Sequence, residues 1–225
     1  MKPDIISETN HWLVLNKPAG MVVEKNPWER AVEDLVLEYL SGKQKKPFVG
    51  IVHRLDRVTS GVLVVAKKKA ALKNLNTQFQ NRKVQKTYFA LVEKAPPSPS
   101  GHLRHFLFKD LKNKKALLFE TPKKSTSACA LFYQIMDSKS DLFLLKIRPE
   151  TGRFHQIRAQ LAAIGCPVLG DKKYGAQRDY FEQSVALHAG ELIFSDPADN
   201  KRISAKAPFP TNKFWMPFLN TPNIP

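Results

Sequence analysis

The sequence predicts a mixed α/β fold of the α+β kind, in which a largely antiparallel mixed β-sheet is flanked by helices and loops. Short apolar or alternating segments typical of strands recur along the chain, and three segments show helical periodicity. Residues 102–148 contain several strand-like runs separated by lysine-rich turns, which is typical of an antiparallel meander. We expect one domain over residues 1–225, because nothing after the proline-rich loop at 95–101 suggests an independent core.

The N-terminal part predicts two short strands, a turn and a helix. Residues 5–6 and 12–15 are apolar, and the turn Asn-Lys-Pro-Ala-Gly follows at 16–20. Residues 29–41 carry apolar side chains at helical spacing and end at a Ser-Gly pair. We expect the proline–glycine turn to order the loop that follows it.

The most informative stretch is His-Arg-Leu-Asp-Arg-Val-Thr-Ser-Gly at 53–61, followed by the apolar strand 62–66. A polar loop that leads into a buried strand holds side chains on a rigid scaffold. Arg54 and Arg57 flank Asp56, and nearby cations favour the ionised form of a carboxylate. Taken alone, Asp56 could instead cap a turn, with both arginines solvated.

Further along the chain, residues 69–81 predict a helix and residues 84–93 an alternating strand that places Tyr88, Ala90 and Val92 on one face. Residues 142–148 predict another strand, and 154–164 a helix with Thr151 as its cap. His155 and Arg158 are three residues apart and share a helix face, whereas Arg153 lies on the turn before it. Either arginine alone could belong to a solvated face.

Together these segments resemble the RluA-type pseudouridine synthases. The segment 53–61 is similar to the signature of that family, and the similarity continues, in the family's order, through the segments 16–20, 86–92, 152–158, 168–175 and 187–189. The resemblance implies the pseudouridine synthase fold, with a bent sheet, and the conversion of selected uridines in ribosomal or transfer RNA to pseudouridine. Three positions depart from the family pattern: Phe154, Cys166 and Asp196.

The resemblance also assigns roles to individual residues. Asp56 is the expected catalytic carboxylate, Arg158 its ionic partner, and Tyr88 the ring that stacks on the uracil. Leu187 is expected to line the base pocket. Arg54 either fills the gap left by a flipped base or binds phosphate. The other residues that we expect to contact RNA are His53, Arg57, Arg153 and His155.

The composition agrees with a polyanionic partner. The 225 residues carry 36 Lys and Arg against 20 Asp and Glu, a net charge of +16, which favours nucleic acid, with an acidic membrane surface as the rival. Lysine-rich turns at 43–46, 67–69 and 109–115 are candidates for this attraction. There is no apolar run long enough to span a membrane and no signal-peptide core, and the two cysteines are too few for a disulfide scaffold. We therefore expect a cytoplasmic protein, acting as a monomer and without an N-terminal RNA-binding domain of the S4 type.

The expected reaction needs neither a cofactor nor a metal, because it adds no atoms and changes no oxidation state. Two other functional classes fit the sequence less well. A non-catalytic RNA-binding protein on the same fold could lack Asp56, Tyr88 or Arg158, yet all three are present. A metal-dependent nuclease or deaminase would need clustered carboxylates or a His/Cys ligand set, and no such motif appears. The sequence leaves open which uridine is modified, and whether Asp56 attacks C1′ or removes a ribose proton.

Overall fold

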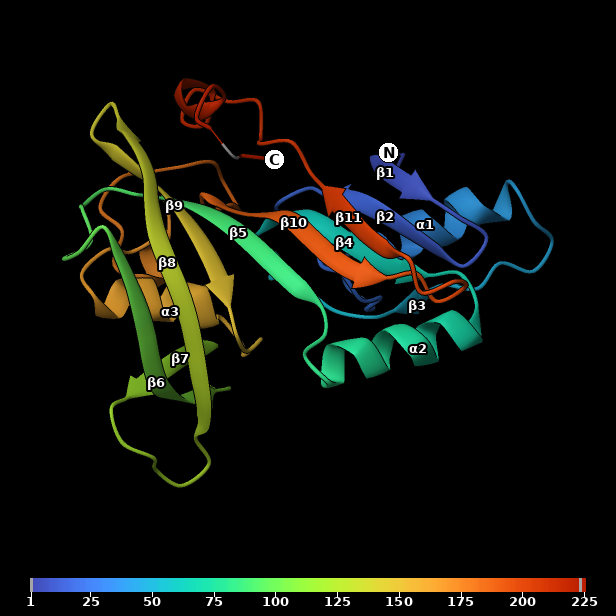
Figure 1. Ribbon diagram of the computed structural model, residues 1–225, viewed down its shortest axis with the longest axis horizontal. Helices are drawn as coiled ribbons and strands as arrows, with labels where there is room; N and C mark the ends of the chain where they lie inside the picture. The colour runs from blue at the N-terminus through green and yellow to red at the C-terminus, as the bar shows by residue number, and fades with distance from the viewer. Residues whose placement is uncertain (1, 223) are drawn as a thin grey trace. The chain divides into compact units, whose positions relative to one another are not determined.

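The computed structural model describes residues 2–222 and 224–225, and the chain forms two compact units (Figure 1). Unit 1 contains Met1–Lys86, His188–Pro210 and Pro225, and unit 2 contains Thr87–Leu187 and Thr211–Ile224. The chain passes from unit 1 to unit 2 within strand β5 (Gln85–Val92) and returns at the start of β10 (Leu187–Ser195). Of the helices in the described part of the chain, none is both long and apolar enough to cross a membrane.

The strands of unit 1 pair in the order β1–β2–β4–β10, with β3 beside β4 and β11 beside β10. Strands β4 and β10 run parallel, and the other pairs are antiparallel. Besides β10, these strands are β1 (Ile5–Glu8), β2 (Trp12–Lys17), β3 (Gly50–Ile51), β4 (Ser60–Ala66) and β11 (Arg202–Lys206). The predicted mixed, largely antiparallel sheet is therefore confirmed in this unit.

The core of unit 1 explains why β2 and β4 are apolar at consecutive positions. Trp12, Val64 and Phe194 pack with Leu75 of helix α2 (Lys69–Gln80) on one face. Residues of the opposite face, such as Leu13 and Leu63, are also fully buried, so both faces of these strands are covered. Burial of both faces removes the polar alternation that a half-exposed strand would show.

Helix α1 (Val32–Ser41) begins three residues later than the sequence pattern predicts. The preceding residues form a turn in which Asn26 Oδ1 accepts the backbone N–H groups of Trp28 and Glu29, at 3.0 and 3.2 Å. A side chain that bonds nearby backbone groups competes with helix formation, which delays the helix start. The Asp34 carboxylate then accepts the Ala31 N–H at 3.0 Å and stabilises the first turn.

Unit 2 is an antiparallel sheet in the order β5–β9–β8–β6–β7. The predicted antiparallel pairing is confirmed, but the predicted meander is wrong, because β8 pairs with β6 rather than with the preceding strand β7. Helix α3 packs against β6, β7 and the short 3₁₀ helix η1. Trp215, which precedes the 3₁₀ helix η2, and Phe218, which ends it, are fully buried. Besides β5, its elements are β6 (Ser100–Asp110), β7 (Lys115–Phe119), β8 (Ser127–Lys139), β9 (Leu142–Pro149), α3 (Gln156–Ala163), η1 (Lys172–Tyr174) and η2 (Met216–Phe218).

The predicted start of α3 was wrong. The residue that precedes the helix is His155, which has a left-handed backbone (φ 50°), so no helical turn can begin before Gln156. Thr151 is not the cap. Its hydroxyl donates to Gln156 Oε1 at 2.7 Å and accepts the Ala130 N–H at 3.1 Å, which ties the loop before the helix to β8.

Candidate active site

The loop that carries Asp56 is fixed at its C-terminal end by the close approach of β4 and β10. Gly61 has φ +113°, and a Cβ there would lie 2.2 Å from the Ala189 carbonyl oxygen. Only glycine therefore permits the parallel pairing of Ser60 with His188 and of Gly61 with Ala189. Ser60 Oγ also lies 2.9 Å from His188 Nδ1. The catalytic signature thus ends on a rigid sheet.

A buried lysine lies under this loop. Lys17, fully buried at the end of β2, donates from Nζ to the carbonyl oxygens of Pro18, Met21 and Arg57, at 2.8, 2.7 and 3.2 Å. Burial lowers the pKa of Lys17 to about 7, although the Asp56 carboxylate favours the charged form. The turn after β2 is therefore tied to the residue next to Asp56, which confirms that this turn orders a loop.

The side chains on either side of Asp56 lie in different surroundings. Arg54 and Arg57 are exposed, and they form ion pairs with Glu24 at 2.7 Å and with Glu29 at 3.5 Å. His53 accepts the Val64 N–H at 3.1 Å, and its ring stacks on Phe79 with centroids 4.7 Å apart.

Burial, with a smaller contribution from Lys86, lowers the pKa of His53 to about 3, so the imidazole is neutral at physiological pH. The two arginines can reach phosphate groups, whereas His53 also joins the loop to β4. That these three residues contact RNA stays a prediction.

Tyr88 and Leu187 both lie in strands. Tyr88 is partly exposed and pairs with Ile147 across β5 and β9, while its neighbours Thr87 and Phe89 are buried. Leu187 is 3% exposed. A partly exposed ring on a rigid strand suits a stacking platform, and a buried leucine suits an apolar pocket wall.

In unit 2, Arg158 is held by a residue that the sequence did not single out. Its Nε and Nη2 donate to the two carboxylate oxygens of Asp171, at 2.6 and 2.9 Å, and both residues are buried. The Tyr174 ring lies against the same guanidinium, with 5.2 Å between the ring centroid and Cζ. This bidentate geometry fixes the direction of the Arg158 side chain.

His155 lies beside this group. Its Nδ1 is 3.0 Å from the Tyr174 hydroxyl, and its ring stacks on Phe154 at 3.8 Å between centroids. Burial, with smaller contributions from Arg158, Lys173 and Lys109, lowers the pKa of His155 to about 3. Arg153 is exposed and its Nε is 3.4 Å from the Ala128 carbonyl oxygen. His155 is therefore neutral at physiological pH, and of the two residues predicted here to contact RNA only Arg153 carries a charge.

Comparison with known proteins decides the family. The family described as RNA pseudouridylate synthase matches residues 11–163. The chain belongs to this family. It is 33% identical over 228 residues to "Ribosomal large subunit pseudouridine synthase C" of Buchnera aphidicola subsp. Acyrthosiphon pisum, covering 96% of this chain and 70% of the relative. It is also 33% identical over 223 residues to "Ribosomal large subunit pseudouridine synthase D" of Zymomonas mobilis, covering 92% and 69%.

Solved structures agree on the fold of this pseudouridine synthase. "Human RNA Pseudouridylate Synthase Domain Containing 4" superposes with a TM-score of 0.77 at 23% identity, covering 95% of this chain and 90% of the other. The RluA-type resemblance and the predicted pseudouridine synthase fold are thus confirmed, and the protein is an isomerase that acts on RNA. Within the described residues, no group of three or more His, Cys, Asp or Glu side chains could hold a metal ion.

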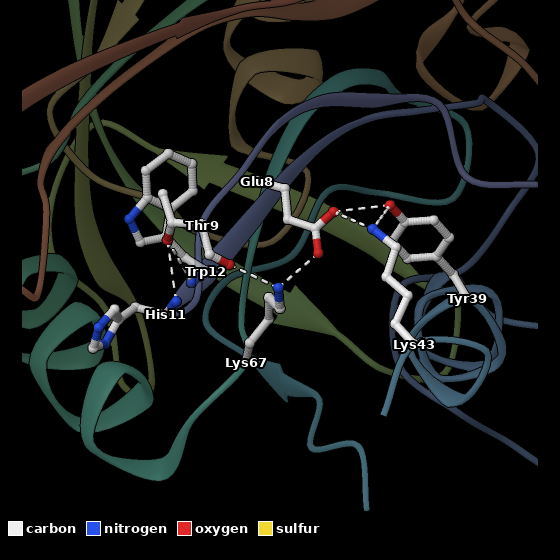
Figure 2. A network of polar contacts seen from close by, with 7 residues as sticks. All are labelled: Glu8, Thr9, His11, Trp12, Tyr39, Lys43 and Lys67. Atoms are coloured by element: carbon white, nitrogen blue, oxygen red, sulfur yellow. Dashed lines mark hydrogen bonds and ion pairs between the residues drawn. The ribbon is translucent and has the colours of Figure 1, made fainter. Parts of the chain in front are cut away.

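The synthase uses some of its predicted RNA-binding lysines internally. Lys67 Nζ donates to Glu8 Oε1 at 2.6 Å and to the Thr9 carbonyl oxygen at 2.7 Å (Figure 2). Lys43 donates to the other Glu8 oxygen at 2.9 Å and also contacts Tyr39. These four side chains, the Glu8 network, join β1 to the ends of α1 and β4. Lys67 is largely buried and therefore has a structural role, whereas Lys43 joins the same network from an exposed position, as exposed as its neighbours in the turn.

Sequence reasoning missed Lys17, Asp171 and Tyr174. Lys17 sits in the Asn-Lys-Pro-Ala-Gly turn, and the other two sit in the Gly-Asp-Lys-Lys-Tyr-Gly segment at 170–175. Both segments resemble the family, so the signal that could have identified these residues was their polar side chains within family-like segments. No periodicity or spacing connected Asp171 with Arg158, thirteen residues apart.

Proposed function

We propose that this enzyme converts specific uridines of ribosomal RNA to pseudouridine, with Asp56 as the catalytic carboxylate. The family match over residues 11–163, which includes the whole signature at 53–61, carries this proposal. Ribosomal RNA is favoured over transfer RNA because the similar proteins of Buchnera and Zymomonas are named as large-subunit ribosomal synthases. Modification of transfer RNA is the alternative outcome.

The reaction breaks the bond between N1 of uracil and C1′ of ribose, rotates the base, and joins C5 to C1′. An ionised Asp56 serves either route, by attacking C1′ or by removing a ribose proton. Arg158, a permanent cation, keeps that carboxylate ionised. Tyr88 supplies a ring face for the uracil, and Leu187 an apolar wall. No redox partner or added atom is required, so the proposed enzyme works without cofactor or metal.

Asp56 belongs to unit 1, and Tyr88 and Arg158 belong to unit 2. The family match also spans both units. We therefore propose that residues 1–225 act as one catalytic domain, as a cytoplasmic monomer that binds RNA directly. Arg54, Arg57 and Arg153 would contact phosphate groups, or fill the gap of the flipped base in the case of Arg54, with His53 and His155 beside them. Flipping a paired uridine costs about a few kcal/mol, which phosphate contacts can offset.

Mapping pseudouridines in ribosomal and transfer RNA from cells with and without the protein tests the substrate. A missing pseudouridine in ribosomal RNA is the expected result, and one missing only in transfer RNA would reassign the substrate. The purified enzyme should keep its activity in EDTA and elute as a monomer. Loss of activity in EDTA would contradict a metal-free mechanism.

Asp56→Asn tests the catalytic assignment. The amide keeps the shape of the side chain but can be neither an anion nor a base, so pseudouridine formation should be abolished while RNA affinity is nearly unchanged. Appreciable turnover by this variant would remove Asp56 from the catalytic role. RNA binding by a wild type that shows no activity would favour a non-catalytic RNA-binding protein.

Tyr88→Phe and Tyr88→Leu separate the ring of Tyr88 from its hydroxyl. The phenylalanine variant should bind RNA normally but react more slowly, and the leucine variant should lose both base stacking and rate. Single-turnover rates and RNA affinities of the two variants decide this. Equal rates in Tyr88→Phe and the wild type would limit Tyr88 to stacking or packing.

A further inference from the structure

One short segment holds Arg158 from two directions. Asp171 binds the edge of the guanidinium through both carboxylate oxygens, at 2.6 and 2.9 Å. Tyr174, three residues later, places its ring against the face of the same group, 5.2 Å from Cζ. A guanidinium fixed at its edge and on its face has little rotational freedom, because the planar fork allows bidentate pairing and stacking together.

The backbone explains why both side chains meet α3. Residues 172–174 form the 3₁₀ helix η1, and side chains three residues apart in such a helix are eclipsed. Asp171 immediately precedes η1 and Tyr174 ends it, and both side chains contact Arg158. His155 immediately precedes α3, with a left-handed backbone, and Arg158 lies in the first turn of that helix, so the predicted shared helix face is wrong. The two segments are joined by two hydrogen-bonded pairs, Asp171 with Arg158 and Tyr174 with His155.

The Tyr174 hydroxyl connects this pair of helices to the sheet. It accepts the Ala116 N–H of β7 at 2.7 Å and lies 3.0 Å from His155 Nδ1. Because the pKa of His155 is about 3, its ring is neutral, and the phenol hydrogen can be donated to Nδ1. Lys115 lies 5.2 Å from the same ring centroid. Tyr174 is thus itself held in place by β7.

We propose that Asp171 and Tyr174 are positioning residues that hold the Arg158 guanidinium in the orientation needed to ionise the catalytic carboxylate. This proposal rests on the proposed function of Arg158. The carboxylate of Asp171 has two opposite effects in it: it fixes the guanidinium, and it offsets part of the positive charge. Removing the side chain and removing only its charge must therefore have different consequences.

Asp171→Ala and Asp171→Asn separate these effects. In Asp171→Ala the guanidinium is free to turn, and the single-turnover rate should fall about 100-fold, as for a misplacement of about 1 Å. The acid limb of its rate–pH profile should move to higher pH, because the catalytic carboxylate loses a cation. Asp171→Asn keeps one oxygen acceptor and leaves the cation uncompensated, so its acid limb should move to lower pH and its rate should fall less.

The matched control is Asp179→Asn, which removes an exposed carboxylate 3.0 Å from Lys172 on the same segment. It should leave the rate, the pH profile and the RNA affinity unchanged. In an Arg158→Ala background, Asp171→Ala should cause no further loss of rate, because its effect passes through Arg158. Losses that multiply, or unchanged pH profiles in both Asp171 variants, would overturn the proposal and leave Asp171 with a purely structural role.

Tyr174 variants keep the proposal testable where Asp171→Ala does not fold. Tyr174→Phe retains the ring, so its rate should stay within about threefold of wild type, whereas Tyr174→Leu should lose about tenfold. Equal losses in both would mean that the hydroxyl contacts, not the ring, matter, and would remove Tyr174 from this role. An active Asp56→Asn enzyme would refute the catalytic assignment separately, while the double-variant result would still report the coupling of Asp171 with Arg158.

Discussion

Among the described residues, Lys17 of unit 1 and Arg158 of unit 2 are buried cations, and they are held in different ways. In unit 1, the Lys17 ammonium donates to three backbone carbonyl oxygens, and burial lowers its pKa to about 7. In unit 2, the Arg158 guanidinium is paired with the carboxylate of Asp171. An ammonium can release its proton near neutral pH, but a guanidinium cannot. The charge of the buried cation in unit 1 therefore depends on pH near neutrality, whereas the charge of the buried cation in unit 2 does not.

The largest expected effect comes from changing the cation of unit 2. Arg158→Ala leaves the buried Asp171 carboxylate without its partner, which should lower stability. It also removes the cation that is proposed to keep Asp56 ionised, so the rate of pseudouridine formation should fall by about 100- to 1,000-fold. Arg158→Lys should recover only part of the rate, because an ammonium cannot reproduce the guanidinium fork. Single-turnover rates measure this. A fully active Arg158→Ala enzyme would mean that another cation serves Asp56.

Lys17→Met tests the pH sensitivity of unit 1. The pKa of Lys17 is about 7 in the folded protein against an ordinary value of 10.5, so between these limits the unfolded chain holds a proton that the folded chain lacks. The free energy of unfolding of the wild type should therefore rise with pH in this window, by an amount on the order of a few kcal/mol.

In Lys17→Met this rise should be absent. Urea unfolding of both proteins between pH 7 and 10.5 gives the difference, which also cancels the contribution of other titrating groups. Parallel curves for wild type and variant would show that Lys17 remains protonated throughout and that the two buried cations behave alike.

A smaller effect on stability is expected at the Glu8 network, and it should depend on pH in a much more acidic range than the effect of Lys17. Burial raises the pKa of Glu8, but hydrogen bonds from Lys67, Lys43 and Tyr39 outweigh it and lower the pKa to about 2 (Figure 2). The stability that this carboxylate contributes is complete above its ordinary pKa of 4.5 and is lost as pH falls towards 2. Glu8→Gln should therefore be less stable than wild type at neutral pH by about 1–3 kcal/mol and should approach it near pH 2. A constant difference across this range would contradict the lowered pKa.

The smallest expected effect is on the salt dependence of RNA affinity, and it should distinguish Lys112 and Lys114 from the Glu8-network lysines Lys43 and Lys67. Replacing Lys112 and Lys114, exposed in the turn between β6 and β7, should reduce the slope of log affinity against log salt by about 0.7–0.9 per lost phosphate contact. Binding of cognate and non-cognate RNA should weaken alike. The control pair is Lys43 and Lys67, whose replacement should lower stability and leave the slope nearly unchanged. If only replacement of the control pair changes the slope, Lys43 and Lys67 contact RNA and Lys112 and Lys114 do not.

The sequence predicted most of the fold because its strands and helices are regular and locally patterned. The apolar run in β4 and the alternation in β5 needed no information from distant residues. The start of α3 could not be predicted, since it depends on the left-handed backbone of His155. Likewise, the support of the Asp56 loop and of Arg158 could not be predicted. Lys17 bonds the backbone of Arg57, next to Asp56, and Asp171 bonds Arg158, and both contacts arise from three-dimensional packing rather than from sequence spacing.

The glycine that ends the signature shows that this nine-residue motif is not a portable unit. Its conformation depends on a strand 128 residues away, whose backbone leaves no room for a side chain at position 61. A graft of residues 53–61 onto another scaffold would carry the reactive side chains but not the strand that sets their direction. Transplanting this signature loop therefore requires β10 to be transplanted with it, in the same parallel register.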